Sequence, residues 1–185
     1  MAIDTASEGF ESGHEVFVAA GLDDTGTNSL WPELRETPVA GRRLNWMRRP
    51  PGYWDLLALL ELTNLLNREQ PDCVHLHTSK AGTIGAVAAR LAGVRPVVYS
   101  SHGHLFNPSL ELEGVSGKGL SERIYYVLRQ VTIDLVDRVI ALSEHDLREQ
   151  VDLGLGRRED FEVIPNGIDF ERFRSVPEAD VEAVE

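Results

Sequence analysis

Short apolar segments alternate with longer segments of helical periodicity along almost the whole chain. Runs rich in valine, isoleucine and other apolar residues predict strands over residues 15–20, 39–44, 73–77, 96–101, 138–142 and 161–164. Apolar residues recurring every three to four positions predict helices over 30–36, 53–69 and 121–136, one that ends at Ala92, and one from Ser143 to near Gly154. Pro71 and Gly93 follow two of these helices and end them.

The order of the elements predicts the fold class. Alternation of strand and helix is typical of a parallel sheet, and these strands are too apolar for either face of the sheet to meet water. We therefore expect an α/β protein with a Rossmann-like parallel sheet, helices on both faces, and a single domain. The segment 102–119 contains glycine and has no periodicity. Loops of this length in compact domains are commonly functional or mobile.

Polar residues follow four consecutive predicted strands at the ends where ligands bind in parallel sheets. They are Ser79 and Lys80 after His77, His102 and His104 after Ser101, Ser143 and Glu144 after Leu142, and Asn166 and Gly167 after Ile164. Because the carboxyl ends of parallel strands meet at one edge, we expect these groups to form a single rim.

Several of these residues also have structural interpretations. Lys80 precedes a helix, where a cation is unfavourable unless an anion shares the site. Ser143, with Asp146 three residues later, has the pattern of a helix N-cap. Glu144 is favourable in a first helical turn whether or not it contacts a sugar hydroxyl. His75 lies deeper in its strand than His77 and is expected to be structural, and Asn166-Gly167 is foremost a turn signal.

The segment His102-Gly103-His104 carries the most specific chemistry. Glycine between two histidines permits a close backbone approach, and a neutral imidazole can donate or accept a hydrogen bond to a sugar hydroxyl. His102 and His104 could join His77 as three metal ligands, but the chain offers no closing motif for a metal site. We expect no metal.

Composition narrows the function classes. The net charge of −12, from 18 basic and 30 acidic residues, disfavours nucleic acid as a partner. The single cysteine, Cys73, cannot form an internal disulfide, which favours a reducing cytoplasm. Arg42, Arg43, Arg48 and Arg49 form a local basic group. It is either a solvated loop or a patch for a phosphorylated ligand or an anionic membrane surface.

Four segments together resemble a known family. These are HLHTSKAGTIGAVAARLAG from His75, PVVYSSHGHLF, DRVIALSEHDLREQ and VIPNGIDFERF. In this order and spacing they resemble the N-terminal domain of glycosyltransferase family 4, retaining enzymes built from two Rossmann domains. The resemblance extends from about Gly13 to Arg174. The HTSKAG and HGH segments look most like members that build capsular, exopolysaccharide or lipid-linked glycans.

The resemblance implies a division of labour between two domains. The N-terminal domain would hold a glycan or lipid-linked acceptor, and the C-terminal domain would grip a nucleotide-sugar donor, with no tightly bound cofactor. His102 matches a family position near the transferred sugar, so it would be the catalytic contact. His77, Ser79, Lys80, Gly103, His104 and Glu144 would line the acceptor side, and Asn166-Gly167 would lead toward the second domain. Such an enzyme would be cytoplasmic, with peripheral contact to the inner membrane face.

Two departures from the family pattern set the expected boundaries. Residues 1–13 look like the remnant of a first helix or a non-native start, so the family's first strand is expected to be missing, which would leave a gap or a re-paired sheet. Residues 14–169 correspond to the Rossmann-like domain and 170–185 to the start of a linker, with the C-terminal domain absent.

These departures predict a chain that is inactive alone. The missing domain could act in trans, and a non-catalytic acceptor-binding or partner-binding module that complements a separate catalytic half is one alternative. A fragment of a nucleotide-sugar epimerase is another. A dinucleotide-dependent dehydrogenase is disfavoured because no G-x-G-x-x-G follows a strand.

Overall fold

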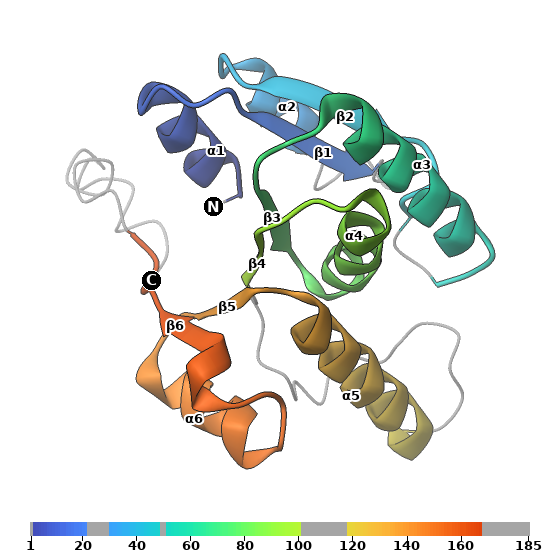
Figure 1. Ribbon diagram of the computed structural model, residues 1–185, viewed down its shortest axis with the longest axis vertical. Coiled ribbons are helices and arrows are strands. Elements are labelled where there is room, and N and C mark those ends of the chain that lie inside the picture. The colour runs from blue at the N-terminus through green and yellow to red at the C-terminus, as the bar shows by residue number, and fades with distance from the viewer. Residues whose placement is uncertain (1, 22–29, 49–50, 101–117, 168–185) are drawn as a thin grey trace, which may run out of the picture.

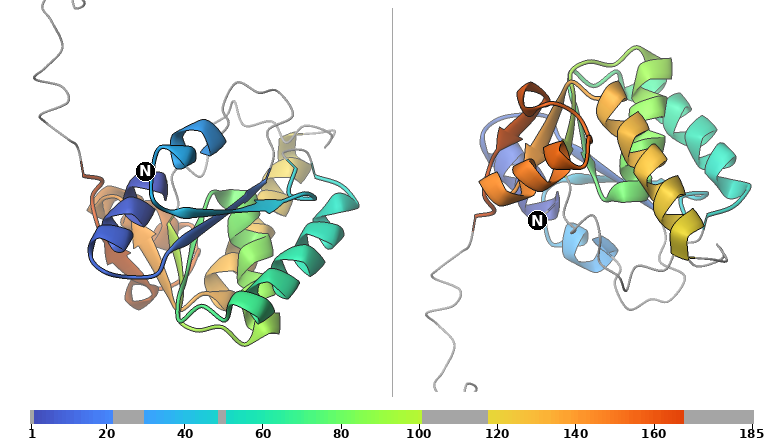
Figure 2. Two further views of the ribbon diagram at one scale, coloured as in Figure 1. Left: turned by 90° about the horizontal axis from the view of Figure 1, so that it is seen from above. Right: turned by 90° about the horizontal axis from the view of Figure 1, so that it is seen from below.

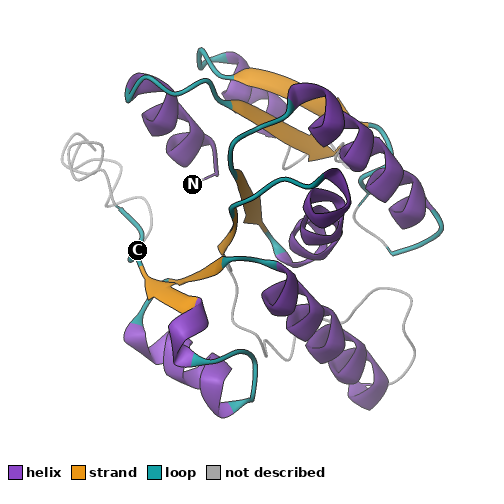
Figure 3. Cartoon of the chain, in the orientation of Figure 1, coloured by secondary structure: helices purple, strands orange, loops and turns teal. Residues whose placement is uncertain are grey.

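The computed structural model describes residues 2–21, 30–48, 51–100 and 118–167. Helices and strands alternate along the chain, as Figure 3 shows. The elements are α1 (Ala2–Glu11), β1 (Phe17–Gly21), α2 (Leu30–Arg35), β2 (Ala40–Leu44), α3 (Trp54–Glu69), β3 (Val74–His77), α4 (Ser79–Ala92), β4 (Val97–Ser100), α5 (Lys118–Leu135), β5 (Arg138–Ala141), α6 (Glu144–Asp152), η1 (Arg158–Asp160) and β6 (Phe161–Val163).

All the described strand pairs are parallel, which confirms the predicted α/β class. The strands form two sheets, β1–β2 and β3–β4–β5–β6. Within the described residues, β1 pairs only with β2 and β3 only with β4. The described strands are thus interrupted between β1 and β3, and these two strands do not pair with each other. A gap is one of the two outcomes expected for a missing first strand.

Helices cover both faces of the strands. Figures 1 and 2 show α3, α4 and α5 on one side of the sheets and α1 and α6 on the other. On β1 the side chains alternate. Phe17 and Ala19 pack against the main core, whereas Val18, and Val16 just before the strand, pack against a small cluster contributed by α1, α2 and Val39. The two sheets therefore share one main core despite the interruption.

Helix α4 lies unusually close to the strands beneath it. A Cβ atom at Gly82 would lie 2.6 Å from the Tyr99 ring of β4, and one at Gly85 would overlap a methyl group of Leu76 in β3. Only glycine permits this approach. The helix ends at Gly93, which adopts a left-handed conformation with φ of 72°. The close packing fixes the N-terminus of α4 over the end of β3.

Among the described residues, no helix combines the length and apolar character that crossing a bilayer requires.

Candidate functional site

The carboxyl ends of β3, β4, β5 and β6 lie level with one another. His77 is the register partner of Ser100, Ser100 of Ile140, and Ala141 of Val163. Neighbouring strands are about 4.8 Å apart, so the four ends span roughly 15 Å. We call this row of strand ends the carboxyl edge. It brings the end of β3 and the end of β6 to the same side of the molecule, as the sequence predicts.

Two histidines and a serine lie along the first two strands of the edge. The His75 Nε2 and Ser100 Oγ atoms are 2.7 Å apart, a hydrogen bond whose donor depends on the histidine tautomer. The His75 and His77 rings are in contact, with centroids 4.2 Å apart and planes tilted by 36°. His75 thus ties β3 to β4, in agreement with its predicted structural role. His77 stands at the strand end and is half-buried.

The turn from β3 into α4 has an uncommon backbone. Thr78 has φ of 66° and ψ of 158°, a region that residues other than glycine rarely adopt. Its carbonyl accepts the first helical hydrogen bond, from the Gly82 amide at 2.9 Å. The Ser79 Oγ lies 2.6 Å from the Tyr125 hydroxyl of α5. Strain of this kind is found mostly at ligand sites, where surrounding structure holds it in place.

The charge of Lys80 is compensated from α3. Its Nζ lies 2.5 Å from Asp55 Oδ1 and donates a 2.8 Å hydrogen bond to the Arg48 carbonyl. The anion predicted to share the N-terminus of α4 is therefore present as a protein carboxylate. Asp55 Oδ2 also accepts from the Gly52 amide at 3.1 Å, which fixes the start of α3.

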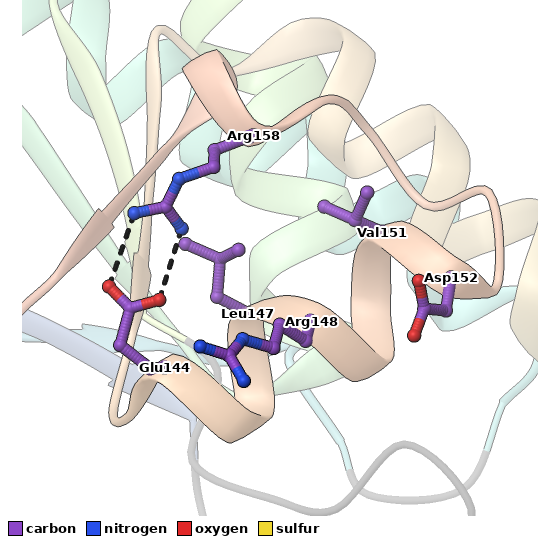
Figure 4. Close-up of a pocket in the computed structure, with 6 residues that line it drawn as sticks. All are labelled: Glu144, Leu147, Arg148, Val151, Asp152 and Arg158. Atoms are coloured by element: carbon purple, nitrogen blue, oxygen red, sulfur yellow. Dashed lines mark hydrogen bonds and ion pairs between the residues drawn. The ribbon is translucent and has the colours of Figure 1, made fainter.

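The end of β5 is organised by helix capping. Ser143 Oγ accepts from the Asp146 amide at 3.1 Å, and Asp146 Oδ2 accepts from the Leu142 amide at 3.1 Å, which confirms the predicted N-cap. Glu144 accepts two 3.2 Å hydrogen bonds from Arg158. Figure 4 shows this pair at one end of a hollow that Leu147, Arg148, Val151 and Asp152 also line. The Glu144 carboxylate is thus engaged within the protein.

Asn166 and Gly167 follow β6 at the far end of the edge. The ladder continues one residue past the strand, because the Ile164 amide donates to the Ala141 carbonyl at 2.9 Å. Asn166 and Gly167 are exposed and lie outside helices and strands. His102, Gly103, His104 and Arg49 lie outside the described residues. No group of three metal-ligating side chains forms among the residues that the structure does describe.

The sequence profile of Glycosyltransferase Family 4 matches residues 2–172. The chain belongs to this family.

Two curated relatives are glycosyltransferases, in agreement with this assignment. A UDP-Gal:alpha-D-GlcNAc-diphosphoundecaprenol alpha-1,3-galactosyltransferase from Escherichia coli is 35% identical over 119 residues, 64% of this chain and 29% of the relative. The capsular polysaccharide biosynthesis glycosyltransferase CapM from Staphylococcus aureus is 31% identical over 127 residues, 66% of this chain and 31% of the relative. The chain therefore spans less than a third of either relative.

The fold also resembles part of a solved structure. Anabaena HepE, crystallised with UDP and glucose, superposes with a TM-score of 0.65 over 99% of this chain and 44% of its own. The sequence identity is 20%, so this likeness concerns the fold alone.

The arginines of the predicted basic group lie in different places in this family-4 chain. Arg42 Nε donates to Glu69 Oε1 at 2.9 Å, and this hydrogen bond raises the pKa of Arg42 and lowers the pKa of Glu69. Arg48 instead stacks on Trp54, at the other end of α3, roughly 20 Å along the helix from Glu69. Arg42 and Arg43 are neighbours on a strand and so point to opposite faces. Among the described arginines, Arg42, Arg43 and Arg48 therefore do not form one patch.

A buried network of polar side chains near the carboxyl edge was not predicted from the sequence. The Arg129 guanidinium lies 4.6 Å from the centroid of the Tyr99 ring, and its Nη2 donates to Gln150 Oε1 at 2.5 Å. Gln150 Nε2 in turn donates to Asp146 Oδ1 at 3.0 Å. Arg129 and Gln150 are both buried. The sequence does contain a sign that Arg129 is buried. It lies three and four residues before Thr132 and Ile133, on the same face of the helix, and both of these residues are buried.

Proposed function

We propose that this chain is the acceptor-side half of a glycosyltransferase of polysaccharide biosynthesis. It would bind a glycan or lipid-linked acceptor while a sugar is transferred from a nucleotide-sugar donor. The observation that carries the proposal is the carboxyl edge, where the strained Thr78 turn separates His77 from Ser79. The sugar-transfer chemistry named for the two relatives, and the UDP and glucose bound to HepE, support this choice of substrates.

The residues at the edge would divide the work. His77 and Ser79 would hydrogen-bond acceptor hydroxyls, and Lys80 would approach an acceptor phosphate from its place beside Asp55. By the family resemblance, His102 would contact the transferred sugar, with Gly103 and His104 beside it. Glu144 and Asn166-Gly167 would border the site at the β5 and β6 ends, and the reaction would occur in the cytoplasm.

We propose further that residues 1–185 bind acceptor but do not transfer sugar. Stabilising the charge of a departing nucleoside diphosphate is usually the largest catalytic contribution. Among the described residues at the edge, Asp55 already compensates the charge of Lys80, and Glu144 compensates that of Arg158. A donor-binding domain, in cis or in trans, would have to supply the remaining positive charge.

The test is titration of the ¹⁵N-labelled chain with a water-soluble N-acetylglucosaminyl diphosphate carrying a short prenyl tail. We expect saturable chemical-shift changes at Ser79 and Lys80, and their loss in His77→Ala. The matched control is His14→Ala, an exposed histidine before β1. Shift changes spread evenly over the chain, or unchanged binding in His77→Ala, would overturn the assignment of the edge. Incubation with UDP-galactose or UDP-glucose should give no glycosylated product, and transfer at a rate near that of a full-length relative would refute the proposed inactivity.

A further inference from the structure

The outward face of α5 is aliphatic. Four exposed side chains recur at intervals of three and four residues and form one stripe along the helix: Ile124, Val127, Leu128 and Val131. We call these four residues the α5 stripe. Val127 is 57% exposed and Leu128 42%. Single exposed apolar residues are ordinary, but a contiguous group usually marks a contact surface.

The inward face of the same helix is unusually polar. Arg129 and Thr132 are both buried. The hydroxyls of Thr132 and Thr83 lie 2.8 Å apart, and those of Tyr125 and Ser79 lie 2.6 Å apart, so two hydroxyl pairs join α5 to α4. A helix at the surface of a single domain normally has the opposite arrangement, with its apolar side inward. Because the inward face already holds α5 on the fold, the α5 stripe remains available to a partner.

The charges beside the α5 stripe are self-complementary. Among the described side chains of α5, Arg123 and Asp134 carry the exposed charges. They lie about three helical turns apart and therefore on the same side of the stripe, and their midpoint nearly coincides with the midpoint of the stripe. Asp134 accepts a 2.8 Å hydrogen bond from the Gln130 side chain, and because that amide is neutral, the carboxylate keeps its charge. One end of this flank is thus positive and the other negative.

We infer that the α5 stripe binds the same stripe of a second copy of this chain, with the two helices antiparallel. A two-fold axis through the middle of the stripe places Val127 against Leu128 of the partner subunit. The same axis places Arg123 opposite Asp134 of the partner subunit, and Asp134 opposite Arg123 of the partner subunit. This reciprocal pairing favours a second copy over an anionic bilayer, which would repel the carboxylate beside the stripe.

The size of the stripe places this contact in the weak, reversible class. Standard interfaces have about 20–30 residues on each side, far more than the stripe and its flanking charges supply. We therefore expect a dissociation constant on the order of 10–100 µM. The stripe lies on the face of α5 opposite its polar contacts and includes none of the residues assigned to the carboxyl edge. The association therefore does not depend on the proposed function.

The test is sedimentation velocity at concentrations from about 1 to 300 µM, which bracket the expected constant. We expect the weight-average sedimentation coefficient to rise reversibly from monomer toward dimer. Val127→Glu should raise the dissociation constant about tenfold or more, because it places two carboxylates at the centre of an apolar contact. Circular dichroism should show an unchanged fold, since Val127 is exposed and glutamate favours helix more than valine does. The matched control is Leu56→Glu, the same change of charge at a 62% exposed leucine of α3, which α4 separates from α5 (Figure 1).

Charge reversal tests the antiparallel arrangement without changing the stripe. Arg123→Glu alone should weaken the dimer about fivefold, because it faces Asp134 of the partner subunit with a like charge. Adding Asp134→Arg reverses both ion pairs at the original net charge, so it should restore the dissociation constant.

Three results would overturn the inference. The first is a chain that remains monomeric at about 300 µM, well above the expected constant. The second is a Leu56→Glu variant that associates as weakly as Val127→Glu, and the third is a double charge reversal that restores nothing. A monomer that sediments with lipid vesicles and loses this binding in Val127→Glu would assign the stripe to a bilayer and would likewise overturn the second copy.

Discussion

The ion pair between Lys80 and Asp55 allows the structural and ligand-binding roles of Lys80 to be separated. The two charged atoms are 2.5 Å apart, and the side chains are 27% and 29% exposed. Exposed pairs contribute about 0.2–1 kcal/mol, whereas removing one partner of a buried pair costs about 3–5 kcal/mol. At this intermediate burial, we expect Lys80→Met to lower the free energy of unfolding by about 1–3 kcal/mol.

The partner variant is Asp55→Asn, which retains an oxygen that can accept from the Gly52 amide. We expect a similar loss from it, and a double variant little worse than either single one. Urea denaturation followed by circular dichroism then gives a coupling free energy of about 1–2 kcal/mol. The exposed pair Arg157–Glu159 is the control, and Glu159→Gln should leave the urea midpoint unchanged. Losses that add within about 0.3 kcal/mol would refute the coupling.

The same two variants, Lys80→Met and Asp55→Asn, also test acceptor binding. If the ammonium of Lys80 contacts the acceptor, Lys80→Met should abolish the chemical-shift changes described above. Asp55→Asn should preserve or strengthen them, because it releases the ammonium from its partner. Equal loss in both variants would show that Lys80 acts only by holding α3 against α4.

Two further predictions concern packing and thiol chemistry. Gly82→Ala should destabilise the protein by about 1–2 kcal/mol, because the new Cβ would lie 2.6 Å from the Tyr99 ring. Gly9→Ala in α1 is the control: the nearest side-chain atom to its new Cβ is 3.4 Å away, so this variant should stabilise the protein by about 0.5–1 kcal/mol. Equal effects in thermal unfolding would contradict this. Burial and the charge of Asp137 raise the pKa of the Cys73 thiol. Iodoacetamide should therefore alkylate Cys73 at pH 8 more slowly in the folded protein than in the urea-unfolded chain, and faster in Asp137→Asn than in the unchanged protein. Equal rates in the folded and unfolded chains would contradict the raised pKa.

Periodicity predicted the elements well because most of them bury a regular apolar face. Every predicted strand and helix is present, and the bounds differ by one to three residues at most ends. The N-cap at Ser143 could also be predicted, because capping depends on a local pattern of two residues. The close approach of α4 to the strands could not be predicted, because the need for glycine at 82 and 85 arises only from contact with Tyr99 and Leu76 in the folded chain.

Contacts between residues distant in the sequence explain the rest. The partner of Lys80 is 25 residues away in α3, and no local pattern indicates Asp55. Likewise, Arg129 meets Gln150 from another helix. The separation of Arg42 from Arg43 could have been predicted, because the segment 39–44 was already assigned to a strand and neighbouring residues on a strand face opposite sides.

Three observations support our proposal that the functional centre lies at the turn between β3 and α4 rather than at the β6 end. Thr78 holds a backbone conformation that costs on the order of 1–3 kcal/mol, and a glycine there would remove that cost. The next residue but one, Lys80, pairs with Asp55 of α3 and donates to the Arg48 carbonyl, so the turn is tied to a second element. The strand that carries the contacting rings of His75 and His77 ends at the same turn. A fold under selection for stability alone would have little reason to keep threonine there, so the strain is most simply explained by a ligand that uses the side chains on either side of it.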